Sequence, residues 1–218
     1  MAGYTFSKSL DDSSSLAEPV NPYNPHLSRG LSSFNIPQSF VVSYDYKLPI
    51  NLLSGPKLLT QGWGLSGVTA FSSGIPVFIY ENDDHSLLET GTAGTMPIGI
   101  DAPNYSGGPI QKLNPRKPGH PYFATSGFTA EPLGQVGTSR RSFFSGPGLN
   151  NFNMALSKDT KLSNRFDLLF RAEFFNVFNH TQFQSVMQAT GNFLSSQFGN
   201  VTSAADPRIG QFALKLRF

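Results

Sequence analysis

The sequence predicts an all-β fold in which about six antiparallel strands form one segment of a larger transmembrane β-barrel with long extracellular loops. Three observations lead to this prediction. Apolar and polar side chains alternate along six segments, long and short connections alternate between them, and charged residues make up only 14% of the chain. Soluble domains carry about 25% charged residues. A chain rich in aromatic and uncharged polar residues suits a wall with lipid on one side and water on the other.

The composition also excludes several classes of protein. The chain has no cysteine, so disulfides, zinc–thiolate sites and thiol nucleophiles are excluded. Its formal net charge of +2 is too small to predict a nucleic-acid partner. The basic pairs Arg116-Lys117 and Arg140-Arg141 lie in Pro/Gly-rich sequence, and we interpret them as solvated loop charges. The N-terminus lacks the basic and apolar segments of a signal peptide, so we expect an export signal upstream of Met1.

The last residues, 209–218, carry the clearest alternation in the chain. Successive side chains of a strand point to opposite faces. One face of this strand therefore carries Phe212, Leu214, Leu216 and Phe218. The opposite face carries Gln211, Ala213, Lys215 and Arg217.

Residues 165–178 repeat this pattern over a longer stretch. Phe166, Leu168, Phe170, Ala172, Phe174 and Phe178 share one face, which Asn176 interrupts. A helix would scatter these aromatic residues around its axis, so the pattern favours a strand. The charged side chains of the last two strands should face the lumen: Arg165, Asp167, Arg171, Glu173, Lys215 and Arg217. We expect Arg165/Asp167 and Arg171/Glu173 to form ion pairs on the barrel wall.

Four more segments fit a strand, near residues 2–9, 34–48, 63–80 and 151–158. The third of these places Trp63, Leu65, Phe71, Val77 and Ile79 on one face. The stretch 81–149 is rich in proline and glycine, which predicts a long irregular loop. The whole chain, residues 1–218, is thus expected to be a partial barrel.

The lengths of the connections predict how the strands cross the membrane. If the last strand ends in the periplasm, the loops near 10–33, 82–149 and 179–208 must lie outside the cell. These are the three long connections, as expected for bacterial barrels, which have short periplasmic turns and long outer loops.

A soluble β-sandwich also shows alternating strands, and it is the main alternative fold. In a sandwich, Phe212, Leu216 and Phe170 would be buried in a globular interior. The low charge and the alternating loop lengths favour the membrane barrel. Bacterial barrels have eight strands or more and outer-membrane transporters about 22, so six strands would need further strands to close.

Several motifs occur in the order and positions of a known family. RAEFFNVFNHTQF and FGNVTSAADPRIGQFALKLRF closely resemble the C-terminal end of TonB-dependent receptors, in particular the Oar-like group that carries a carboxypeptidase-regulatory-like domain. Upstream, YTFSKSLDDSSS, FVVSYDYKLP and GWGLSGVTAFSSGIPVFI resemble successive strands of the same barrel. The similarity covers nearly the whole chain except the loop around residues 81–140.

This resemblance implies an outer-membrane receptor that moves a substrate with energy delivered by TonB. The family's plug domain and TonB box lie near its N-terminus and are expected outside this chain, together with the earlier barrel strands. The expected partners are outer-membrane lipid, TonB acting through the plug, and the barrel assembly machinery. The resemblance implies that this machinery recognises the terminal Phe218 together with Phe212, Leu214 and Leu216.

No enzyme signature is found, and we expect no catalytic, cofactor or metal site. Gly62–Gly67 matches the dinucleotide fingerprint, but a strand-like and not a helical sequence follows it. Asp83-Asp84-His85 with Glu89 fits a solvated acidic turn better than a cation site. Two other functions stay open, namely a passive porin-like barrel and a soluble β-rich binding module.

Overall fold

The computed structural model describes the chain except residues 16–20, 22, 51–54, 88–100, 118 and 184–190. The predicted fold class is confirmed, because the described residues form antiparallel sheets with only two short helices, α1 (Pro25–Ser28) and α2 (Lys57–Thr60). Neither helix has the length and apolar character needed to cross a bilayer.

A six-stranded antiparallel sheet forms the body of the molecule. Its strands are β1 (Ala2–Phe6), β4 (Gln38–Lys47), β5 (Trp63–Ser72), β8 (Leu149–Lys161), β9 (Asp167–Phe175) and β10 (Ile209–Arg217). They are hydrogen-bonded in the order β1-β4-β5-β8-β9-β10, so each strand pairs with the strand of this sheet that follows it in the sequence. The two outermost strands, β1 and β10, each have one neighbour in this sheet, and the described sheet is therefore open at both edges.

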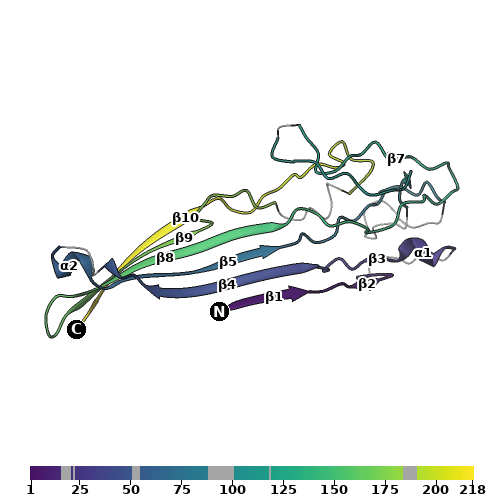
Figure 1. Cartoon of the computed structure of the whole chain (residues 1–218). Helices are drawn as coiled ribbons and strands as arrows, with labels where there is room; N and C mark the ends of the chain where they lie inside the picture. The colour runs from purple at the N-terminus through teal and green to yellow at the C-terminus, as the bar shows by residue number, and fades with distance from the viewer. Residues whose placement is uncertain (16–20, 22, 51–54, 88–100, 118, 184–190) are drawn as a thin grey trace.

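The two ends of this sheet differ in the size of their connections (Figure 1). The C-terminus, α2 and the turn between β8 and β9 lie at one end. The long connections 7–37, 73–148 and 176–208 lie together at the other end. An antiparallel meander requires this separation, and the long connections are the ones that the sequence places outside the cell.

Strand β5 ends earlier than the sequence predicts. The alternation was expected to continue to residue 80, but the strand stops at Ser72. Val77 and Ile79, expected on the same face as Trp63, are buried among loop residues instead. The prediction was wrong here because alternation shows which side chains share a face and does not show what covers that face.

Strand β9 likewise ends before the predicted boundary at residue 178. Asn176 has a positive φ of 51°, a left-handed conformation that asparagine tolerates better than most residues. Its side chain donates to the His180 carbonyl (2.8 Å) and accepts from the His180 amide (3.0 Å). Asn176 interrupts the apolar face in the sequence because it forms a turn.

The long connections contain ordered structure, including the stretch predicted to be an irregular loop. Two short sheets lie there, one of β2 (Leu10–Asp11) with β3 (Gly30–Leu31) and one of β6 (Asn104–Tyr105) with β7 (Phe128–Thr129). A hydrophobic core, here called the loop core, consists of Val77, Ile79, Tyr122, Phe123, Phe128 and Phe144. Phe193, Phe198 and Val201 from the last long connection pack against it, so two loops share one core.

A buried arginine joins the first long connection to the second. Arg141 is only 8% exposed and donates to the carbonyls of Ser28 and Asp11, each at 3.2 Å, and to the Asp11 carboxylate. The interpretation of Arg140-Arg141 as two solvated charges is therefore wrong for Arg141, whereas Arg140 is exposed. Burial raises the pKa of Asp11, but hydrogen bonds from Ser32, Ser14 and Arg141 outweigh it, and the pKa lies below its ordinary value.

Candidate functional site: the two faces of the six-stranded sheet

The pairing of β9 with β10 places the predicted apolar residues together on one face. Phe212 lies opposite Ala172, Leu214 opposite Phe170, and Leu216 opposite Leu168. Phe212 and Leu214 are 69% and 68% exposed. Phe218 follows the end of β10 and is fully accessible. Within the described part of the chain, no second sheet covers these side chains as a sandwich would require.

The same apolar face continues across the other four strands. Several antiparallel pairs keep apolar residues opposite one another, as in Tyr4 with Phe40 and Leu65 with Leu156. The remaining apolar members are Phe6, Val42, Tyr44, Tyr46, Trp63, Phe71, Phe152, Met154 and Phe174. The same face also carries Gln38, Thr69, Asn150, Lys158 and Thr160, so the six strands present a surface that is mainly aromatic and aliphatic.

Aromatic rings cross this face as a belt at the end nearest the long connections. Phe40 on β4 stacks on Phe71 of β5, with ring centroids 6.4 Å apart. Phe71 meets Phe152 of β8 edge to face at 5.4 Å, and Phe152 meets Phe178 beyond β9 at 4.9 Å. Membrane barrels carry such girdles of aromatic residues where the bilayer meets water.

A second interfacial cluster lies at the opposite end of the face. The Trp63 indole N–H donates to the Leu59 carbonyl at 2.8 Å, and the Lys158 ammonium lies 4.9 Å from the centre of the Trp63 ring. Lys158 also donates to the Gln61 carbonyl at 2.9 Å. From Trp63 to Phe71 the strand advances about 26 Å at about 3.3 Å per residue. With a tilt of about 40°, this advance corresponds to about 20 Å along the membrane normal, somewhat less than the apolar band of about 25 Å found in barrels.

Glycines on the apolar face receive the aromatic rings of neighbouring strands. Gly67 lies opposite Tyr44, and a Cβ at Gly67 would come within 2.6 Å of the Tyr44 hydroxyl oxygen. Gly210 lies opposite Phe174 in the same way, and a Cβ there would come within 2.9 Å of the Phe174 ring. Covering a strand glycine with an aromatic ring is a known way of stabilising a curved sheet.

The opposite face carries most of the charged residues predicted for the lumen, interspersed with apolar residues such as Val41, Val68, Leu169 and Phe175. Asp167, Arg171, Glu173, Lys215 and Arg217 all lie on it by register. Arg171 donates to the Glu173 carboxylate at 2.6 Å, so this predicted pair forms. Gln211 also donates to Glu173 from the neighbouring strand. We call this side the polar face.

The ion pair of Arg217 with Asp159 was not predicted. Asp159 of β8 is paired with Leu169 of β9, whereas Arg217 of β10 is paired with Asp167, so this ion pair runs diagonally across β9. The sequence could not show this contact, because it depends on the register of three strands.

One predicted lumen residue does not lie on a strand. Arg165 is in the exposed turn before β9, which begins at Asp167. Its backbone amide donates to the Ser163 hydroxyl at 3.2 Å. Among the ion pairs of the described residues, none joins Arg165 to Asp167, so this predicted pair does not form.

A shallow hollow of about 300 Å³ lies over the middle of the sheet. Most of its lining comes from the polar face, including Asp45, Ser66, Asn153, Arg171 and Glu173.

An apolar face with two interfacial clusters, together with a polar inner face, defines the wall of a transmembrane β-barrel. In lipid the backbone finds no water, so a sheet can cross only as part of such a closed wall. A family model described as an outer membrane beta barrel domain matches residues 1–211. The chain belongs to this family and is a protein of the cell outer membrane. The comparisons with curated proteins and with solved structures give no significant match.

Proposed function

We propose that this chain forms the C-terminal strands of a TonB-dependent receptor of the Oar-like kind, which moves a substrate across the outer membrane. The observation that carries the proposal is the open sheet of six strands with one apolar face and one charged face. Such a sheet exposes unpaired backbone groups at β1 and β10 and needs further strands to close in lipid. The resemblance of the C-terminal motifs to this receptor family supports the same assignment.

The proposed mechanism assigns the strands a structural role and the loops a binding role. The polar face lines the water-filled lumen. There the charges of Arg171 and Glu173 compensate each other in an ion pair. The earlier barrel strands and the plug of the same receptor complete the transporter. TonB acts on the plug, and the protein acts as a transporter and not as an enzyme.

The test uses the complete outer-membrane protein that contains these residues, purified through an epitope inserted between Gly107 and Gly108. Both glycines are exposed, and a side chain at either one would meet no atom within 4 Å. We expect the protein to bind the periplasmic domain of TonB. It should show no steady conductance in planar bilayers, because the barrels of 22-stranded outer-membrane transporters are plugged. Steady conductance without TonB binding would show a passive porin instead.

The terminal strand supplies a second test, which concerns assembly. We propose that the barrel assembly machinery recognises Phe218 with Phe212, Leu214 and Leu216. Phe218→Ser should reduce the folded protein in outer membranes several-fold, since the recognised aromatic ring is lost. The folded fraction is measured by mobility of unheated samples on gels.

Phe6→Ser is the matched control, because Phe6 is an exposed aromatic residue of the same sheet but lies far from the C-terminus. It should leave the assembled amount near that of the wild type. Both variants should also refold from urea into detergent as well as the wild type does. If Phe218→Ser lowered the folded fraction as much in detergent refolding as it does in outer membranes, Phe218 would act only in packing.

A further inference from the structure

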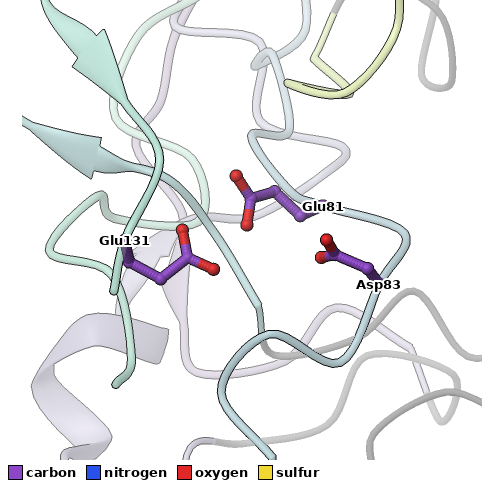
Figure 2. A group of neighbouring side chains, drawn as sticks. All are labelled: Glu81, Asp83 and Glu131. Atoms are coloured by element: carbon purple, nitrogen blue, oxygen red, sulfur yellow. The ribbon is translucent and has the colours of Figure 1, made fainter. Parts of the chain in front are cut away.

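Three carboxylates converge in the connection between β5 and β8. Each of Glu81, Asp83 and Glu131 offers an oxygen, and these oxygens lie within 4.8 Å of one another. Figure 2 shows the three carboxylate groups turned toward a common centre. Glu81 and Asp83 come from the segment just after β5, whereas Glu131 follows β7.

Two of these side chains are buried without the hydrogen bonds that such burial normally requires. Glu81 is 1% exposed and Glu131 is 3% exposed. Among the described residues, no hydrogen-bond donor reaches either oxygen of Glu81, either oxygen of Glu131 or the Asp83 Oδ1 atom. A buried carboxylate without a donor or a counter-charge costs several kcal/mol. The described residues therefore supply no donor to the carboxylate oxygens that face the centre of this cluster.

The charge around this centre is strongly negative. Buried Asp101 lies beside Glu81, whose amide donates to the Asp101 carbonyl at 2.9 Å. The basic group recorded in ion-pair range among the described residues is the His85 imidazole, with its Nδ1 atom 3.5 Å from Glu131.

We propose that Glu81, Asp83 and Glu131 bind a calcium ion that links the segment after β5 to the segment after β7 within the long connection 73–148. Calcium prefers carboxylate oxygens and binds them at about 2.3–2.6 Å. Two oxygens on opposite sides of one ion then lie up to about 4.6–5.2 Å apart, which accommodates carboxylate oxygens that all lie within 4.8 Å of one another. Magnesium usually keeps several waters and binds one or two carboxylates, so a cluster of three carboxylates fits calcium better.

The sequence predicted a different role for this region. Asp83, Asp84, His85 and Glu89 were interpreted as a solvated acidic turn, and Glu89 lies outside the described residues. The proposed site keeps Asp83 but adds Glu81 and Glu131, which are distant in sequence and buried by the fold. The proposal does not depend on TonB coupling, because the ligands all lie in loops of this chain.

The experiment is a calcium titration of the complete protein in detergent after treatment with a chelator. Calorimetry should show one calcium per chain with a dissociation constant below about 1 mM, and calcium should raise the melting temperature. Glu81→Gln and Glu131→Gln should each weaken calcium binding at least tenfold. Asp83→Asn, at a partly exposed position, should weaken it several-fold with less effect on folding.

Asp206→Asn is the matched control, because Asp206 is an exposed acidic residue of another long connection. It should bind calcium as tightly as the wild type. The proposal is overturned if the wild type takes up no calcium at millimolar concentration and its melting temperature does not move. It is also overturned if Glu81→Gln binds calcium as tightly as the wild type, or if magnesium binds more tightly than calcium.

Discussion

Replacing Leu214 by arginine should lower the free energy of unfolding of the protein in lipid vesicles by about 2–4 kcal/mol. Leu214 lies near the middle of β10, opposite Phe170, and is 68% exposed on the apolar face. A guanidinium group there would have to enter hydrocarbon without a partner. Urea titration of vesicle-embedded protein, followed by tryptophan fluorescence, measures the loss.

The matched control is Gln211→Arg on the polar face of the same strand. Gln211 lies opposite Glu173 and already donates to its carboxylate, so an arginine there gains a partner in water. We expect little or no loss of stability in this variant. Equal losses in the two variants would contradict a wall with lipid on one side and water on the other.

Replacing Arg141 by methionine should destabilise the packing of the long connections by about 3 kcal/mol. The substitution removes the Arg141 donor from the Asp11 carboxylate, which keeps its hydrogen bond from Ser14, and from the Ser28 carbonyl. The sheet itself should persist, since these hydrogen bonds of Arg141 are made to residues of the long connections. Limited proteolysis and hydrogen exchange of the loops measure the loss, and the mobility of unheated barrel on gels checks the sheet.

Arg140→Met is the control for this prediction, because Arg140 adjoins Arg141 but is exposed. It should leave protease resistance unchanged. The pKa of Asp11 is lowered in the folded protein, so the stabilisation is present at neutral pH and is lost as the pH falls below the ordinary pKa of 3.8. If both methionine variants were equally resistant to protease, Arg141 would not hold the loops together.

The sequence predicted the faces of the strands well because the period of two is a local property. Phe212 and Leu214 belong to one face whatever the rest of the chain does, and the register confirms that Phe170 shares it. The ends of strands were predicted less well. Ile79 continues the alternation of β5 but is buried in the loop core, because a partner loop and not lipid covers it.

Contacts between distant segments could not be predicted from one sequence. Arg140 and Arg141 are identical in type and adjacent, yet only the second is buried. The difference comes from Asp11 and Ser28, which the fold brings beside it. The same reason applies to Glu131, which joins Glu81 only once β7 is packed.

The loop core changes how a ligand would meet the outer end of this protein. Its aromatic rings interlock edge to face, as Phe123 does with Phe144 at 5.0 Å and with Phe198 at 5.4 Å. The residues of this core are held in place by packing, so a molecule that bound against them would not have to supply the entropic cost of ordering them. Such a molecule would be selected by how well its shape fits a surface that exists before it binds.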